Sequence, residues 1–323
     1  MSAVLGRTRA YGLGKEVTAG IPVAASVWIP QQDVTVEDKI SRIYDNSGLG
    51  TRAENFAGDT DMITADGNLN GLVYDQSFGH LALAAVGSVS DAAHTGATGA
   101  YDHTFTPGNT LPTYTIAIKD GNESTQSAYG TLDKLELKMG QGSYVTFTSS
   151  WKAQQSAPAS NTVAFTSENR FRPQDVVVKI ASTVAGLSGA TPLRVKDLTF
   201  SVENSVITEP SLGTTNPSYY PGTRKLKLQM GRLYLDTSIK ALVFGTTQQA
   251  MSITMTRADV SIGTGTPTNP SLTITFQPGF FADWSRDGGL DALKQEKFTL
   301  EPIFSTSASQ EFNMVLTNMK ASY

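Results

Sequence analysis

Alternation of apolar and small polar residues is the feature of this sequence that most limits its fold. It runs through Ser271–Gln277, Met251–Met255 and Tyr144–Ser149, where large apolar side chains alternate with Ser or Thr. A period of two places the apolar side chains on one face of a strand and the hydroxyl groups on the other. The pattern therefore predicts antiparallel strands that are covered on one face and wetted on the other.

The wetted faces of these strands carry mostly Ser and Thr, whereas an ordinary solvent face carries more Lys and Glu. A hydroxyl-lined face is neutral and hydrated, so it suits the wall of a water-filled channel. An ordinary sheet with a Thr-rich outer face is the alternative. The strand Arg224–Asp236 differs because Lys225 and Lys227 make its polar face cationic, which favours a charged edge, a subunit interface or a plain solvated strand. Gly231 offers a bulge at which its alternation can change phase.

Composition excludes several classes of protein. The 323 residues suffice for one large domain or two ordinary ones, and 29 Gly and 14 Pro favour turns and strands. The net charge of −4 leaves no broad basic surface for tight binding of nucleic acid. The absence of cysteine excludes disulfides and thiolate chemistry. Residues 1–30 contain charges and no long apolar run, so we expect no signal peptide, no membrane span and synthesis in a cytoplasm.

A faint internal repeat divides the sequence into two similar halves. Five segments of the first half recur in the same order, at nearly constant spacing, in the second half. Each half has a helix signal that begins at a capping residue, Asp75 or Ser77 and then Thr237, and ends at a glycine. The paired segments are Val36–Asp38 with Val195–Asp197, Asp45–Ser47 with Glu203–Ser205, Phe78–Gly87 with Ile239–Gly245, Tyr114–Ile118 with Leu272–Phe276, and Val145–Ala153 with Met314–Ala321.

The repeat predicts a mainly β fold with two tandem β-sandwich or barrel domains, each flanked by one short α-helix. We place the first domain, with an N-terminal arm, at 1–155 and the second at 156–323. The first carries 10 Lys and Arg against 16 Asp and Glu, while the second carries 15 against 13, so unlike halves are electrostatically complementary. The alternatives are that β-sandwiches repeat strand patterns without duplication, and that the charge difference is dispersed over solvent faces.

Three polar segments are too long to belong to a core: Met1–Pro30, Asp45–Asp66 and Glu203–Thr223. They nevertheless contain apolar side chains that a partner surface could bury. We expect the first two to contact a subunit in the next ring of an assembly. The candidate contact residues, together with the cationic strand, are Ile21, Trp28, Phe56, Asp59, Asp61, Met62, Tyr219, Tyr220, Lys225 and Lys227.

No catalytic or metal-binding motif stands out in the sequence. His80, His94 and His103 lack the paired spacing of metal ligands. The run Gly12-Leu-Gly14-Lys15 lacks the spacing of a phosphate loop and is interpreted as a flexible turn. A carboxylate pair that acts on sugars is assembled by the fold and leaves no motif. We expect no catalytic residue, no metal and no other cofactor.

Short motifs along nearly the whole chain resemble those of the tail tube proteins (major tail proteins) of long-tailed, siphovirus-like bacteriophages. They are Gly12–Glu16, Gly20–Pro22, Trp28–Pro30, Asp45–Ser47, Gly67–Leu69, His103–Pro107, Leu111-Pro112 and Val315–Asn318. The resemblance implies a structural virion protein that self-assembles into stacked rings, the hollow tube that conducts DNA during ejection. Its implied partners are copies of itself, a tape-measure protein, a tail terminator and tail-tip proteins, with transient, non-specific passage of double-stranded DNA.

The chain departs from the simplest pattern of that family because it is doubled. If each half is one tube domain, three chains form a ring of true threefold and pseudo-sixfold symmetry. A hexameric ring with the second half outside is the alternative. Two functions of other classes stay open: a carbohydrate-binding β-sandwich on a virion or cell surface, for which Tyr219-Tyr220 is the candidate aromatic pair, and a tail-associated glycan hydrolase.

Overall fold

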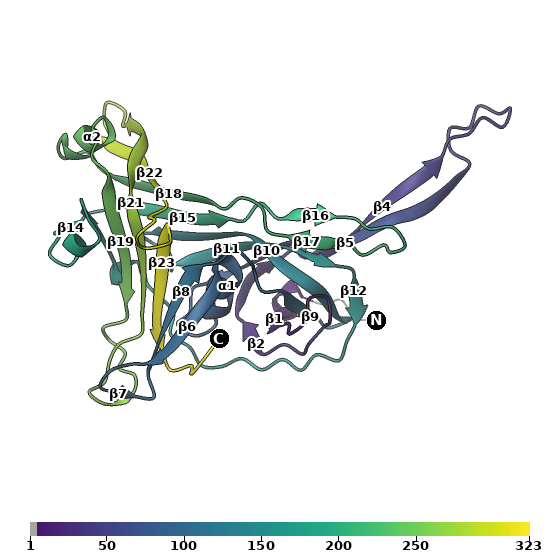
Figure 1. Ribbon diagram of the computed structural model, residues 1–323, viewed down its shortest axis with the longest axis horizontal. Helices are drawn as coiled ribbons and strands as arrows, with labels where there is room; N and C mark the ends of the chain where they lie inside the picture. Colours follow the sequence, from purple (N-terminus) through teal and green to yellow (C-terminus); the bar gives the residue numbers. More distant parts are fainter. Residues whose placement is uncertain (1–4) are drawn as a thin grey trace.

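The computed structural model describes residues 5–323, which form a mainly β fold with two short α-helices (Figure 1). This confirms the mainly β prediction, and the alternating segments lie on strands as expected. Neither α-helix of the described part is long and apolar enough to cross a membrane.

Strand pairing follows the same order in the two halves of the chain. Six antiparallel strands of the first half pair in the order β4 (Glu37–Asp45), β5 (Ala57–Leu72), β11 (Thr146–Gln154), β10 (Ser124–Gly140), β9 (Tyr114–Lys119), β1 (Ala10–Lys15). Those of the second half pair in the order β15 (Asp197–Glu203), β18 (Lys225–Leu233), β22 (Gln295–Pro302), β21 (Ser271–Asp287), β19 (Gln249–Thr256), β13 (Val176–Ala181). The topology therefore repeats, while the division into two domains stays a prediction.

The strands β10 and β21 are equivalent in this repeat. Each has 17 residues and changes partners midway, β10 from β9 to β11 and β21 from β19 to β22. The change occurs at the same irregularity in both strands, a bulge with one extra residue. Ser127 to Gly130 of β10, and likewise Phe276 to Gly279 of β21, spans one residue more than the segment of the partner strand that it pairs with. Gly130 and Gly279 thus occupy equivalent places.

This equivalence corrects two of the segment pairings predicted from sequence. Tyr114–Ile118 lies in β9, whose counterpart is β19 and not the strand that contains Leu272–Phe276. The closing segment of the first half lies in β11, whose counterpart is β22 and not β23 (Phe312–Asn318). Similar alternation in neighbouring strands made the wrong matches look regular, because period-two patterns carry no information about which strands pair.

Two strand pairs join the halves, β10 with β15 and β8 (Tyr101–Pro107) with β23. β10 pairs with β15, with Leu137 opposite Phe200 and Lys134 opposite Glu203. The remaining pieces extend the sheet or lie outside it: β2 (Val27–Ile29), β3 (Gln31–Val34), β6 (Gly87–Ala93), β12 (Ser156–Pro158), β14 (Pro192–Leu193), the hairpin β16 (Ile207–Glu209) with β17 (Ser218–Tyr220), the pair β7 (Ala97–Thr98) with β20 (Thr264–Gly265), and the 3-10 turns Gly6–Thr8, Pro173–Asp175 and Ala185–Leu187.

A single hydrophobic core runs through both halves, and it includes the fully buried rings of Trp151 and Phe298. All residues of α1 (Phe78–Val86) are buried, and the helix ends at Gly87, whose φ of 100° is the left-handed conformation that glycine adopts at helix ends. Both predicted helices are confirmed. However, α2 (Ser238–Val243) buries only Ile239.

The N-terminal segment belongs to the body of the protein, which contradicts the expectation that it is too polar for a core. Tyr11 and Leu13 of β1 are fully buried. Gly12 lies inside β1, where a Cβ atom would come within 2.9 Å of the Trp28 ring, so packing and not a flexible turn requires glycine there. Residues 1–4 of the expected arm lie outside the described part of the chain.

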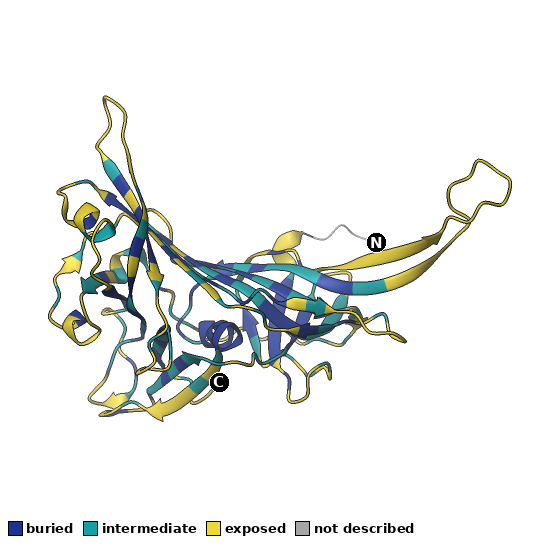
Figure 2. Cartoon of the chain, turned by 45° about the horizontal axis from the view of Figure 1, so that its top comes forward, coloured by how far each residue is buried: buried dark blue, intermediate teal, exposed yellow. Residues whose placement is uncertain are grey.

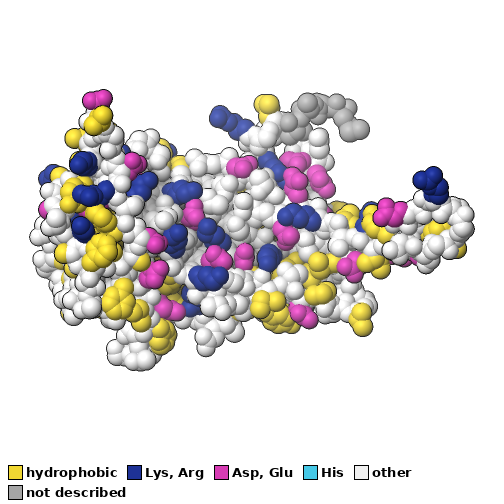
Figure 3. Space-filling model, turned by 90° about the horizontal axis from the view of Figure 1, so that it is seen from above, with side chains coloured by type: hydrophobic (Ala, Val, Ile, Leu, Met, Phe, Trp, Pro, Cys, Tyr) yellow, Lys and Arg dark blue, Asp and Glu magenta, His cyan; other side chains and the backbone are white. Residues whose placement is uncertain are grey.

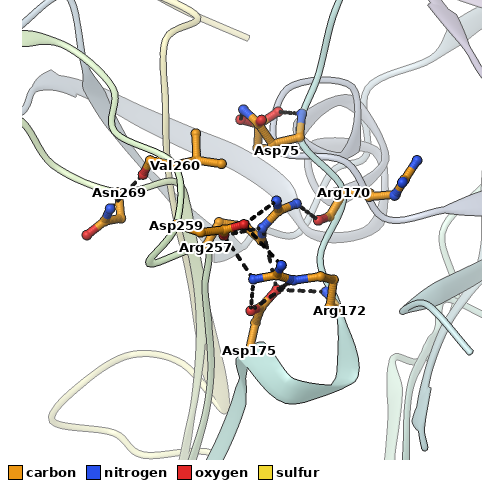
Figure 4. Close-up of polar contacts among 9 residues, drawn as sticks. Asp75, Arg170, Arg172, Asp175, Arg257, Asp259, Val260 and Asn269 are labelled. Carbon is orange, nitrogen blue, oxygen red and sulfur yellow. Dashed lines mark hydrogen bonds and ion pairs between the residues drawn. The ribbon is translucent and has the colours of Figure 1, made fainter. Parts of the chain in front are cut away.

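A charged network fixes the segment between the halves (Figure 4). The Arg172 guanidinium lies between the carboxylates of Asp175 and Asp259, at N–O distances of 2.8 and 2.9 Å. Arg257 donates to Asp259 as well, and also to the backbone carbonyl of Arg170. Hydrogen bonds from Arg257 lower the pKa of Asp259 to about 2, so this carboxylate stays charged. The network ties the connecting segment to the turn after β19.

The alternation of β18 continues through Gly231 without a bulge, which contradicts the expected change of phase. Arg232 therefore points into the core, where its Nε donates to Glu296 at 2.6 Å. Both side chains are buried, and the indole nitrogen of Trp284 donates to the second carboxylate oxygen at 2.8 Å. The core of the second half thus contains a buried ion pair between β18 and β22.

We predict that Arg232→Met destabilises the fold by about 3–5 kcal/mol, because the buried Glu296 carboxylate loses its counter-charge. The double variant Arg232→Met/Glu296→Leu should recover most of that loss, since no unpaired charge remains. Chemical denaturation of the parent and the two variants measures the free energies of unfolding. A double variant no more stable than the single one would contradict this account of the pair.

Candidate assembly surfaces

A two-stranded arm projects from the body of the molecule (Figure 1). We define it as residues 40–63, where β4 and the first part of β5 pair with each other. The sequence predicted an irregular polar segment over Asp45–Asp66, but its second part is a strand and only residues 46–56 connect the two. Every residue of β4 is exposed, and the arm carries little of the buried surface seen in the body (Figure 2).

The arm leaves its apolar side chains uncovered. Ile40, Ile43 and Tyr44 are 54, 58 and 59% exposed, and Leu49 and Phe56 are exposed near the tip. A two-stranded ribbon without a core beneath it is at best marginally stable in water. Exposed apolar side chains gathered on such a ribbon mark a surface that another molecule covers.

The arm is also acidic. Its Asp and Glu residues, Asp45, Glu54, Asp59 and Asp61, outnumber the two arginines, Arg42 and Arg52. The hydroxyl and the backbone N–H of Ser47 both donate to the Asp45 carboxylate and lower its pKa. This carboxylate therefore keeps its charge in mildly acidic solution.

The residues predicted to make contacts do not form one surface. Those that are exposed or half-buried are Ile21, Phe56, Asp59, Asp61, Met62, Tyr220, Lys225 and Lys227. In contrast, Trp28 is only 4% exposed, and Tyr219 is buried with its hydroxyl donating to the Ala153 carbonyl at 2.6 Å. The surface of these two rings is therefore already used inside the chain.

The outward face of the long sheet mixes hydroxyl groups with paired charges. One row across it reads Thr148, Glu136, Ser201 and Lys227. Lysines on either side of Glu136 along β10 lie 2.9 Å from its carboxylate and keep its pKa low against the effect of burial. In the view from above, Lys or Arg and Asp or Glu side chains are interspersed across the middle of the molecule (Figure 3). Charges of both signs therefore lie side by side on this face.

The hydroxyl-lined faces predicted from sequence are divided between two surfaces. Thr146 and Thr148 of β11 lie on the outward face just described. Thr254 of β19 and Thr273 of β21 instead line a hollow of about 400 Å³ beside the short turn Ala185–Leu187. These two strands therefore share no common wall with β11.

Two of the open strand edges lie at opposite ends of the row of strands that runs from β4 through β10 and β15 to β21. Among the described residues, β4 pairs only with β5, and residues 280–287 of β21 pair only with β22. Next to β4, Arg9 donates to the outward carbonyl oxygens of Val34 and Val36, so the open edge begins at Glu37. Open edges are sites at which another chain can add a strand.

Two of the three histidines, His80 and His103, pack against the same ring, Tyr323, at centroid distances of 5.1 and 4.7 Å. His103 is fully buried, with Nδ1 2.6 Å from the Asp91 carboxylate and Nε2 3.0 Å from the side-chain oxygen of Asn318. His80 is a buried residue of α1 whose ring nitrogens have no hydrogen-bond partner, and burial lowers its pKa to about 3. Over residues 5–323, no three His, Asp or Glu side chains are arranged to hold a metal ion.

Sequence reasoning missed a second exposed apolar group on the body. Phe280, Ile303 and Phe304 are 41, 40 and 53% exposed, beside the open edge of β21. Each lies in an apolar stretch or next to a turn, where the sequence alone gives no sign that the side chain is exposed. Only the strand pairing of β21 could have identified the three as exposed.

Comparison with known families decides the class of the protein. The family model described as "Phage tail tube protein" matches residues 6–278. The chain belongs to this family. It is accordingly a bacteriophage structural protein of the virion tail, and the resemblance found in its short motifs is confirmed. No curated protein sequence matches the chain.

We predict that deleting Gly48–Gly58 leaves a soluble, folded subunit that no longer polymerises, because the deletion removes the arm tip and no core residue. Circular dichroism and denaturation report folding, and sedimentation reports polymer. The control is Val17→Ser, a change at a 97% exposed residue outside the arm, which should affect neither folding nor polymerisation. Normal polymerisation of the deletion variant would show that the arm is dispensable.

Proposed function

We propose that this tail tube protein is the repeating subunit of a hollow tube, built from stacked rings, that conducts double-stranded DNA during ejection. The observation that carries the proposal is the pair of open edges, on β4 and on β21, at opposite ends of one row of strands. A subunit with unlike open ends associates head to tail, which closes into a ring when the rotation is right. The exposed arm and the family support the same proposal.

The ring contains three chains in this proposal. The two halves have the same strand order, so three chains place six equivalent units around the axis. The acidic first half and the basic second half then alternate around the ring. Such complementarity favours unlike neighbours and disfavours contact between like halves.

The outward face of the long sheet lines the channel in this arrangement. Its hydroxyl groups hold water, and several of its lysines lie beside carboxylates, as at Lys134–Glu136 and Lys225–Glu203. A wall whose lysines are partly offset by carboxylates binds phosphates more weakly than a basic wall, so DNA can pass without being held. Ser201 and Thr148 keep the spaces between the charged pairs neutral.

The partners follow from the tail as a whole. Copies of the chain itself form the tube, a tape-measure protein lies inside it, and a tail terminator and tail-tip proteins occupy its ends. The chain is made in the host cytoplasm and works without a cofactor or catalytic residue. Neither a carbohydrate-binding module nor a glycan hydrolase is favoured by any observation, since Tyr219 of the candidate aromatic pair is buried.

Purified protein should form long hollow polymers at high concentration, and the isolated ring should have the mass of three chains. Negative-stain images test the first statement and native mass spectrometry the second. Protein that stays monomeric at high concentration over a range of salt, even with preformed tail tips as nuclei, would end the tube proposal. A ring of six chains would end the threefold arrangement and leave the tube function intact.

A further inference from the structure

The contact between the two halves shows how the second half of the chain docks on the first. Beyond the β10–β15 pairing, the chain between β15 and β18 folds back over the first half. The Val206 N–H donates to the Asp133 carboxylate at 2.7 Å, and Lys152 Nζ donates to the Val206 carbonyl at 2.6 Å. The Gln154 amide donates to the carbonyl of Pro217 at 3.1 Å. The β16–β17 hairpin thus docks where β10 bends and β11 ends.

The second half has the same receiving place. Gly279 is the counterpart of Gly130, and Phe280 follows it as Thr131 follows Gly130. Across the ladder, Thr131 lies opposite Lys152, and Phe280 lies opposite Glu301. The positions that receive the hairpin in the first half therefore correspond to Phe280 and to the end of β22 with the residues that follow it.

Nothing within the described chain covers this second receiving place. Thr131 is 2% exposed beneath the internal joint, whereas its counterpart Phe280 is 41% exposed. Ile303 and Phe304 are exposed beside it. In the first half the equivalent surface is covered by the β16–β17 hairpin. Three exposed apolar side chains on the uncovered second-half surface therefore indicate that a segment similar to that hairpin binds there.

The chain has one further element in the position of the docking hairpin. The β16–β17 hairpin connects β15 to β18, and the arm connects their counterparts β4 and β5. The arm is therefore the first-half equivalent of the hairpin. Its base is held within the chain, where the Ile63 N–H donates to the Thr215 carbonyl at 3.0 Å, but among the described residues the outer edge of β4 has no partner. The arm lies far from β22 in the same molecule (Figure 1), so the two can meet only between copies.

We propose that the arm of one copy docks on Phe280, Ile303 and Phe304 of a second copy, repeating between chains the joint that the β10–β15 pairing makes within one chain. The inference rests on the proposed assembly and names its contact. Ile40 and Tyr44, which share one face of β4, cover the receiving side chains, while Ile43 lies on the other face. The contact is head to tail, because the arm of one copy and the receiving side chains of the other are different surfaces.

Cysteine cross-linking tests the contact directly, because the chain has no cysteine of its own. We would mix a Tyr44→Cys protein with an Ile303→Cys protein, allow polymerisation and add a short bis-maleimide. A covalent dimer that contains both proteins is expected. A mixture of Val17→Cys with Ile303→Cys should give none. Polymers that form normally but yield no arm-to-receiver dimer would overturn the inference and leave the tube proposal standing.

Substitution of the receiving surface provides a second test. Phe280→Ser/Phe304→Ser should abolish polymerisation while the monomer keeps its thermal stability, because both rings are already exposed in the single chain. The control Leu290→Ser removes a fully exposed apolar side chain at the β21–β22 tip and should polymerise normally. If the double variant polymerises like the parent, the receiving surface is wrongly assigned. If the parent itself forms no polymer, the tube proposal fails instead.

Discussion

The antiparallel pairing of β10 with β15 is the interaction on which the rest of the structure depends. It makes one sheet of two halves that have the same strand order, and it places their apolar faces over one core. Leu137 opposite Phe200 and Leu135 opposite Val202 bury the joint, while Lys134 and Glu203 face outward across it. Because backbone pairing is closed at this joint, the row of strands from β4 through β10 and β15 to β21 has its unpaired backbone groups at its ends, while β6 keeps a further open edge elsewhere.

Those open ends explain features that make little sense in an isolated molecule. The arm exposes Tyr44 and its neighbours on a ribbon without a core, and the opposite end exposes Phe280 where its counterpart is buried. Each feature would favour non-specific association if it stood alone. Together they form the two halves of one contact, and the internal joint supplies the pattern by which they fit.

The elements that could be predicted from the sequence are those set by local patterns. The helix from Phe78 to Gly87 was predictable because its apolar run and the left-handed glycine that ends it are local, although the predicted cap, Ser77, makes no side-chain cap hydrogen bond. Strand alternation was predictable for the same reason. Strand pairing was not, since period two is shared by every strand, and the matches of β9 and β11 were wrong in consequence.

The assembly surfaces were only partly predictable, because burial depends on contacts distant in sequence. Phe56 and Met62 were correctly placed on a projecting segment, but Tyr219 looked equally exposed and is buried against Ala153. Gly12 looked like a flexible turn until the Trp28 ring was found over it. Phe280 carries no local signal, and only comparison with Thr131 across the repeat shows that its exposure is exceptional.

Hydrogen exchange of the polymer against the monomer tests the central claim, that copies join through the open edges of β4 and β21. The backbone amides of β4 and of residues 280–287 should exchange much more slowly in the polymer, because a neighbouring chain covers them. The amides of β9, already paired on both sides within the chain, should not change. Polymers in which neither open edge gains protection would contradict the account.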